Sequence, residues 1–473
     1  MTTVKLPKWA TALDVLAIVM AAVSISVLLT GGFRVWFFKL ELSVTGWWRP
    51  ALWSAIAVAI RHALVRHRPL PQHVAGGVRA WWRHPDTQLA WPVLVTTRCG
   101  VFLVGFLAVL MIGYPDESPM RWRIYANHFL DLPARWDAGW YLGIAMQGYK
   151  FDPWVGTTVQ QNIAFFPAFP MAMRYLSAVL GHQLLWTGVG ISLVAFFLSQ
   201  VYFLRLARLE LGDEDAAAAG MTLLAAYPFA VFFSVPYTES LFLLTLLGAV
   251  YHFRRGGLAK AAIWGFICGL TRPNGFLLSI VIGLMALSPF VDRTRRRLVW
   301  PAETPIAAVA GQGFAAAAPI FGVLAYSAFV WQLTGHPFTW TAQNAAWGRV
   351  YRSIDALVAE PAAFIFEHGV YEFAVNQPIN IVYWVVVLFA FAAVWPVYRR
   401  LGLPYAALIL LTVVPPMLVG GLLSIGRITS VLFPVFMWLG AAVPARHRTA
   451  WIGLFALFQG FVAVMFFTWR PLY

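Results

Sequence analysis

The stretch LLWTGVGISLVAFFLSQVYFL, residues 184–204, decides the fold of this chain. It contains no charged residue over a length that matches the hydrocarbon core of a bilayer, which about 20 apolar residues span as a helix. Backbone groups in lipid have no water to bond with, so the segment must satisfy its own hydrogen bonds. Residues 184–204 are therefore predicted to form a membrane-spanning helix.

Comparable apolar runs recur along the chain. They are Leu13 to Thr30, Trp91 to Ile112, Pro305 to Trp331, Ile379 to Val397 and Trp451 to Phe467. Hydrophobic residues make up 60% of the 473 residues and charged residues 11%, a composition far more apolar than that of soluble domains. We predict an all-α polytopic membrane protein, with N-terminal transmembrane helices and a basic cytoplasmic loop over residues 1–90 and a larger membrane domain over residues 91–473.

The net charge of +15 is explained by membrane topology. The positive-inside rule places basic turns between apolar runs in the cytoplasm, so no nucleic-acid partner is expected. With the N-terminus also inside, and the first apolar run retained as a helix, the chain is predicted to cross the membrane about 13 times. The basic turns are those with Arg61, Arg66, Arg68, Arg79 and Arg83, with Arg205 and Arg208, with Arg254, Arg255 and Lys260, with Arg293 and Arg295 to Arg297, with Arg399 and Arg400, and with Arg446 and Arg448.

This topology gathers the unusual polar residues on the non-cytoplasmic face of a cell inner (plasma) membrane. Two long loops, 113–166 and 333–378, and three short turns, 236–240, 271–275 and 424–430, lie on that face. The first loop is rich in aromatic residues, which predicts short interfacial helices along the membrane surface.

Asp137 is the most conspicuous acid of the first long loop, in the stretch ARWDAGWY of residues 134–141. Burial between Trp136 and Trp140 would raise its pKa, whereas the charge of Arg135 would lower it. A general base needs such tuning. The equally weighted alternative is a carboxylate that caps a helix beginning near Ala138.

Ordered motifs around Asp137 resemble those of bacterial relatives of the PIG-V mannosyltransferases, which belong to the GT-C superfamily. The similar stretches are RWDAGWY at 135–141, GY at 148–149, NIAFFP at 162–167, YP at 227–228, FFS at 232–234, PYTES at 236–240, TRPNG at 271–275, GHP at 335–337, QNAAWG at 343–348, SIGR at 424–427 and FP at 433–434. Together they span the chain from about Trp91 to its C-terminus.

The resemblance implies a GT-C type bundle and a transferase, expected to be a mannosyltransferase, that takes a sugar from a polyprenyl-phosphate carrier at the non-cytoplasmic face. It also implies a catalytic base in the first outer loop, which here would be Asp137. The eukaryotic relatives act in glycosylphosphatidylinositol assembly, so the acceptor of this chain, a lipid or a glycan with a free hydroxyl, is left open. The simplest mechanism is inverting displacement by the activated hydroxyl.

Arg427 and Arg272 are the best candidates to bind the donor phosphate, because a fixed arginine stabilises the charge that the leaving phosphate gains. The alternative is that each anchors its helix at the interface. Glu239 would bind substrate hydroxyls or, equally, form an ion pair with Arg272. Asn162 and Asn274 are further substrate-binding candidates, although asparagine is also ordinary turn chemistry.

The remaining substrate-binding candidates are Arg135, Trp136, Trp140, His336 and Trp347, with the tryptophans suited to stacking on sugar rings. An interfacial aromatic belt is the alternative for the tryptophans. Isolated histidines and the spacing of Asp131, Asp137 and Asp152 match no metal motif, so neither a metal nor a cofactor is expected.

A second hypothesis is a transporter or flippase that binds lipid-linked sugars without cleaving a bond. Transporters often show internal repeats and broken helices at the membrane midplane. The sequence has no repeat of fixed period, and its polar residues gather at one face, so the glycosyltransferase is the favoured prediction.

Overall fold

The computed structural model describes residues 7–37, 40–65, 69–116, 122–156, 158–288, 291–292, 297–298 and 305–472. Five basic residues of the topology argument lie outside this part of the chain, namely Arg66, Arg68, Arg293, Arg295 and Arg296. The chain divides into two compact units, Met1–Gln88 with Met171–Thr187, and Leu89–Pro170 with Gly188–Tyr473.

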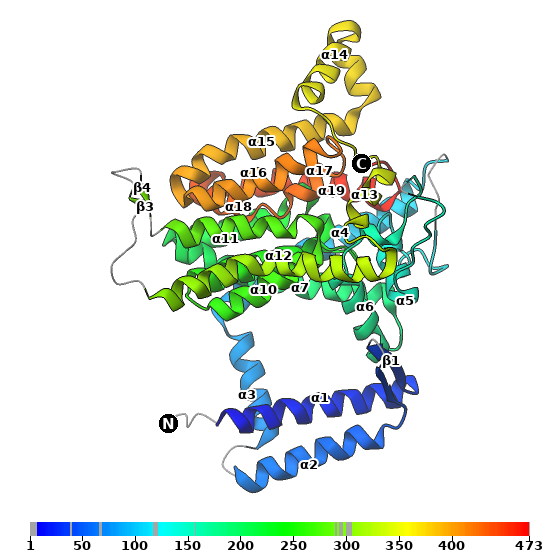
Figure 1. Cartoon of the computed structure of the whole chain (residues 1–473), viewed down its shortest axis with the longest axis vertical. Helices are drawn as coiled ribbons and strands as arrows, with labels where there is room; N and C mark the ends of the chain where they lie inside the picture. The colour runs from blue at the N-terminus through cyan, green and yellow to red at the C-terminus, as the bar shows by residue number, and fades with distance from the viewer. Residues whose placement is uncertain are drawn as a thin grey trace. The chain divides into compact units, whose positions relative to one another are not determined.

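The first unit is built on two packed helices, α1 (Lys8–Thr30) and α2 (Trp48–Leu64) (Figure 1). An antiparallel hairpin of β1 (Phe33–Phe37) and β2 (Leu40–Val44), which the sequence analysis did not predict, connects them. The helix α3 (Leu70–Trp82) follows.

A buried ion pair joins the helices of the first unit. The carboxylate of Asp14 in α1 lies 2.8 Å from Arg61 Nε in α2 and 2.6 Å from His73 Nδ1 in α3. An acid in an apolar helix is tolerated where it is paired in this way.

The second unit is a helical bundle, in which α10 (Leu258–Thr271) packs against both α9 (Glu239–Arg254) and α12 (Ile306–Thr334). The helix α15 (Pro378–Leu401) packs on α16 (Leu403–Leu418) (Figure 1). The helices α4, α6 and α7 have residues in both units. The elements of the second unit, with these three shared helices included, are α4 (Pro85–Met111), α5 (Ala138–Gln147), η1 (Asn162–Ala164), α6 (Ala168–Val179), α7 (Leu184–Leu211), α8 (Glu214–Ala226), η2 (Pro228–Phe233), α9 (Glu239–Arg254), α10 (Leu258–Thr271), η3 (Pro273–Leu277), α11 (Leu278–Leu287), β3 (Val291–Asp292), β4 (Arg297–Leu298), α12 (Ile306–Thr334), α13 (Thr339–Gln343), η5 (Asn344–Trp347), α14 (Ile354–Asn376), α15 (Pro378–Leu401), α16 (Leu403–Leu418), α17 (Ile425–Thr429), α18 (Phe433–Ala442) and α19 (Ala445–Phe467).

The prediction of a predominantly helical membrane protein is confirmed. Six described helices are long and apolar enough to cross a membrane by length and composition, and each covers one of the six predicted apolar runs to within one residue at its ends. Among the described residues, the strands form two short two-stranded antiparallel sheets, β1–β2 and β3–β4. Shorter apolar helices accompany the six, and the count of about 13 crossings stays a prediction.

A break between α8 and α9 leaves backbone carbonyl groups inside the bundle, and polar side chains of other helices bond to them. The chain leaves α8 at Tyr227 and forms the buried 3₁₀ helix η2, which frees carbonyl groups from regular helix bonding. Arg98 of α4 donates to the carbonyls of Ala225 and Ala230, and Gln459 of α19 donates to those of Ala225 and Tyr227 at 2.9 Å. These donors replace the water that the interior lacks.

Glycines allow α10 and α12 to approach closely. A Cβ atom on Gly269 would lie 2.0 Å from the carbonyl oxygen of Pro319, and one on Gly322 would lie 2.1 Å from that of Phe266. Small residues at such crossings permit backbone contact between membrane helices.

We predict that Gly322→Ala destabilises the bundle by about 1–3 kcal/mol, because the added methyl overpacks the crossing. The measurement is the midpoint of thermal unfolding in detergent. Gly313→Ala in the same helix is the control, since a Cβ there meets open space. Equal midpoints for the two variants would contradict the close crossing.

Candidate active site

Asp137 lies immediately before α5 and faces Arg427. Its Oδ2 accepts a hydrogen bond of 2.6 Å from Arg427 Nη1, and the two side chains are 23% and 16% exposed. Asp137 is the N-cap residue of α5, but its side chain makes no capping hydrogen bond. The alternative of a simple helix cap is therefore wrong, and the carboxylate is directed to the ion pair.

Glu239 is the second carboxylate of the site and the first residue of α9. Its side chain is 1% exposed, and its Oε1 lies 2.9 Å from Arg272 Nη1 and 3.9 Å from Arg427 Nε. The ion pair with Arg272, one of the two alternatives for Glu239, is thus formed. Within the described residues Oε2 is buried and has no hydrogen-bond partner.

Arg427 connects the two carboxylates. It belongs to the short helix α17, which follows the left-handed residue Ser424 (φ 60°). Burial acts to lower the pKa of Arg427, but the charges of Asp137 and then Glu239 outweigh it and raise the pKa. Arg427 is therefore a fixed cation, and the quartet of Asp137, Glu239, Arg272 and Arg427 is a continuous network of charges.

Tyr237 fixes the backbone that presents Asp137. Its hydroxyl donates to the carbonyl oxygen of Arg135 at 3.2 Å and accepts from the Asp137 N–H at 3.0 Å. Burial, followed by the charge of Asp137, raises the pKa of Tyr237, which keeps the hydroxyl protonated for both bonds. Between the bonded groups, Trp136 has a left-handed backbone (φ 52°), a conformation that needs such support in a non-glycine residue.

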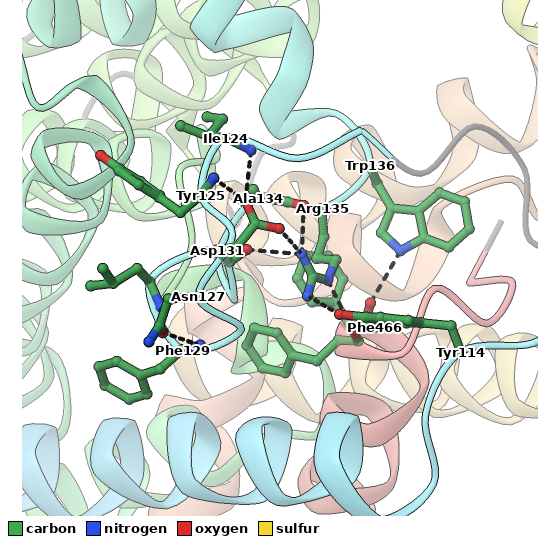
Figure 2. A network of polar contacts seen from close by, with 12 residues as sticks. Tyr114, Ile124, Tyr125, Asn127, Phe129, Asp131, Ala134, Arg135, Trp136 and Phe466 are labelled. Carbon is green, nitrogen blue, oxygen red and sulfur yellow. Dashed lines mark hydrogen bonds and ion pairs between the residues drawn. The ribbon is translucent and has the colours of Figure 1, made fainter.

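Arg135 is buried and bonds to its own loop and to α19, contrary to its assignment as a substrate-binding residue. The side chain is fully buried and donates to the carbonyls of Asp131, Ala134 and Phe467 at 2.8 Å each. It also lies 3.5 Å from the carboxylate of Asp131, whose other oxygen accepts from two backbone N–H groups (Figure 2). Arg135 therefore ties the loop before Asp137 to the end of α19.

Three of the predicted aromatic residues differ in their contacts. Trp140 stacks on Phe165 with ring centroids 5.6 Å apart, and Trp347 meets Trp140 edge-on at 5.4 Å. Both tryptophans are half-buried, as a sugar-stacking surface requires. Trp136 instead packs against Trp469 at 4.9 Å and donates to the carbonyl of Phe466 (Figure 2).

Asn162 and His336 make local contacts. The Asn162 amide accepts from the Lys150 N–H at 3.0 Å and donates to the Gly148 carbonyl at 3.1 Å, which is turn chemistry. His336 is exposed in the turn after α12, where its backbone bonds to Thr334. Asn274 is half-buried in η3, two residues after Arg272. Substrate contacts by these three residues stay predictions.

The carboxylates do not gather as a metal centre would need. Among the described residues, no group of three or more histidine, cysteine or acidic side chains is placed to bind an ion. Asp131 bonds to the backbone of its own loop, and Asp152 accepts from the Trp154 N–H at 2.9 Å.

Arg349 is a residue of the site that the sequence analysis missed. It follows the motif stretch 343–348 directly and is half-buried. Burial, then the positive charge of Arg427, lowers its pKa to about 10, with Arg272 acting in the same direction and Asp137 opposing. Arg349 is thus within the electrostatic influence of the quartet. The only signal in the sequence was its position after a motif of the resembling family.

Residues 108–292 match the family described as Mannosyltransferase (PIG-V). Asp137, Glu239 and Arg272 lie within this segment, and Arg427 lies beyond it. The GPI alpha-1,6-mannosyltransferase 2 of Mus musculus is 30% identical over 154 residues, and that of Homo sapiens is 29% identical over 154 residues. Each alignment covers 30% of this chain and 29% of the relative, so the chain matches less than a third of the length of these proteins.

Solved structures of an oligosaccharyltransferase from Archaeoglobus fulgidus are also similar. The complex with Zn and sulfate gives a TM-score of 0.40 at 15% identity and covers 78% of this chain and 53% of that chain. The complex with an inhibitory peptide and a dolichol-phosphate gives a TM-score of 0.40 at 15% identity, with 81% and 56% covered.

We predict that Arg135→Leu destabilises the fold by about 3–5 kcal/mol, because it leaves the buried Asp131 carboxylate and several carbonyls without their donor. Hydrogen exchange of residues 124–141 should accelerate, since the loop loses its tie to α19. The control is Arg123→Leu, an exposed arginine of the same loop. Unchanged exchange and unfolding in Arg135→Leu would show that the loop is held by other contacts.

Proposed function

We propose that this chain, a PIG-V-like protein by its segment 108–292, is a membrane mannosyltransferase that uses a polyprenyl-phosphate mannose donor. The observation that carries the proposal is the quartet of Asp137, Arg427, Glu239 and Arg272, which combines a candidate base with fixed cations. Three of its four members fall in the segment that matches the family.

The arrangement supports direct displacement at the anomeric carbon. Arg427 engages Oδ2 of Asp137, which leaves Oδ1 to accept the proton of an acceptor hydroxyl. The acceptor oxygen forms its bond to the anomeric carbon as the bond from that carbon to the phosphate oxygen breaks. The polyprenyl phosphate leaves with the electron pair, and the configuration inverts. Nearby arginines stabilise the charge that develops on the leaving phosphate.

The substrate surfaces extend the same proposal. The unpartnered Oε2 of Glu239 would accept from a hydroxyl of the sugar or the acceptor. Trp140 and Trp347 would stack on a sugar ring. The acceptor is a lipid or a glycan with a free hydroxyl, and the site would open to the non-cytoplasmic face of the plasma membrane, as the distribution of basic turns favours.

We predict that Asp137→Asn lowers mannose transfer by about 10²–10⁴-fold, because the amide cannot accept the proton. The measurement is transfer of labelled mannose from a synthetic polyprenyl-phosphate mannose to a membrane-lipid extract. Binding of the donor should be largely retained, and Asp152→Asn, in the same outer loop, is the control. Full turnover by Asp137→Asn would exclude Asp137 as the base, and donor binding without turnover by the wild type would favour a transporter.

We predict that Arg427→Gln lowers kcat/KM by about tenfold or more, because two carboxylates then share Arg272 and Asp137 loses its orientation. Steady-state kinetics with the same donor provide the measurement. Arg446→Gln is the matched control, since Arg446 is exposed and bonds only to His447 among the described contacts. Wild-type kinetics for Arg427→Gln would return Arg427 to a purely structural role.

A further inference from the structure

Arg349 is held in place by the turn that follows η5. Gly348 adopts a left-handed conformation (φ 72°), and the Arg349 N–H donates to the Asn344 carbonyl at 3.3 Å. Arg352 then donates its N–H to the Leu418 carbonyl at 2.8 Å, and Tyr351 forms an isolated β-bridge with Val419. The backbone on both sides of Arg349 is therefore fixed.

Contacts on the two sides of Arg349 lead to the segments that carry Asp137 and Arg427. On one side, Trp347 packs on Trp140, which lies three residues after Asp137. On the other side, the Arg349 side chain packs over Gly420, where a Cβ atom would lie 3.3 Å from the Arg349 Cγ atom. The chain runs from Gly420 directly to α17 and Arg427.

The cations of the site differ in how they are compensated. Arg427 pairs with Asp137 and Arg272 pairs with Glu239. In the part of the chain that the structure describes, Arg349 has neither a carboxylate within ion-pair distance nor a side-chain hydrogen bond. Its pKa of about 10 still leaves it charged at neutral pH. Three arginines thus face two carboxylates, and the excess positive charge falls on Arg349.

We propose that Arg349 binds the phosphate of the polyprenyl-phosphate lipid, while Arg427 and Arg272 serve mainly to neutralise and orient Asp137 and Glu239. The inference rests on the proposed function and names a residue that was not among its candidates. A half-buried arginine without a partner supplies the directional donors that a phosphate needs. The one excess positive charge matches the single negative charge of a phosphodiester donor.

The test is equilibrium binding of polyprenyl phosphate to the purified full-length protein in detergent, which requires no sugar transfer. Arg349→Gln should bind polyprenyl phosphate about tenfold more weakly or worse, since a charge-assisted bond is lost, and Arg349→Lys should bind with intermediate affinity. Arg352→Gln is the control, because Arg352 lies in the same turn but pairs with the exposed Glu360. Thermal unfolding of each variant reports on folding.

Two further ligands separate the sources of affinity. Polyprenol, which lacks the phosphate, should bind equally to wild type and Arg349→Gln, and inorganic phosphate should compete with polyprenyl phosphate only where Arg349 is intact. Wild-type affinity of Arg349→Gln for polyprenyl phosphate, or no saturable binding by the wild type, would overturn the proposal. Arg349-dependent binding without mannose transfer would support it while refuting the proposed function.

Discussion

The buried charge of Glu239 is the constraint on which the candidate site depends. A carboxylate that is 1% exposed costs several kcal/mol unless cations compensate it. Arg272 comes from the end of α10 and Arg427 from α17, so the turns that carry them are drawn to the start of α9. Because Arg427 also bonds to Asp137, the loop before α5 joins the same network. One compensated charge thus fixes four segments relative to one another.

These segments can meet because the helices are interrupted where the functional residues lie. Asp137 precedes α5, Glu239 begins α9, and Arg272 directly follows α10. Each interruption releases backbone groups that a membrane interior cannot hydrate. Arg98 and Gln459 bond to the carbonyl of Ala225 in the last turn of α8, and Arg135 bonds to carbonyls of the loop before Asp137. Buried donors remote from the chemistry are therefore part of what builds the site.

The sequence predicted those features whose free-energy cost in a membrane depends on the residues nearby in the chain. The spanning helices were found because bilayer thickness fixes the length of an apolar run, and Asp137, Glu239 and Arg427 were found because charges are expensive beside such runs. The partners of Arg135 could not be found, since it bonds to the carbonyl of Phe467, 332 residues later. Arg349 escaped for a similar reason, because its place depends on the bridge between Tyr351 and Val419. Local pattern identifies costly groups, whereas tertiary contacts decide what compensates them.

The charges of the site also suit the proposed transfer from beginning to end. The donor phosphodiester carries one negative charge, which balances the excess of one arginine over the two carboxylates. On transfer the leaving lipid becomes a phosphate monoester with a charge of about −1.5 to −2. At the same step Asp137 takes up the acceptor proton and becomes neutral, so the positive excess of the site rises by one. The two changes nearly cancel, and little net charge is created in surroundings where electrostatic energies are large. When Asp137 later loses that proton, the negative charge of the lipid phosphate exceeds the one excess positive charge of the site. This excess negative charge favours release of the lipid.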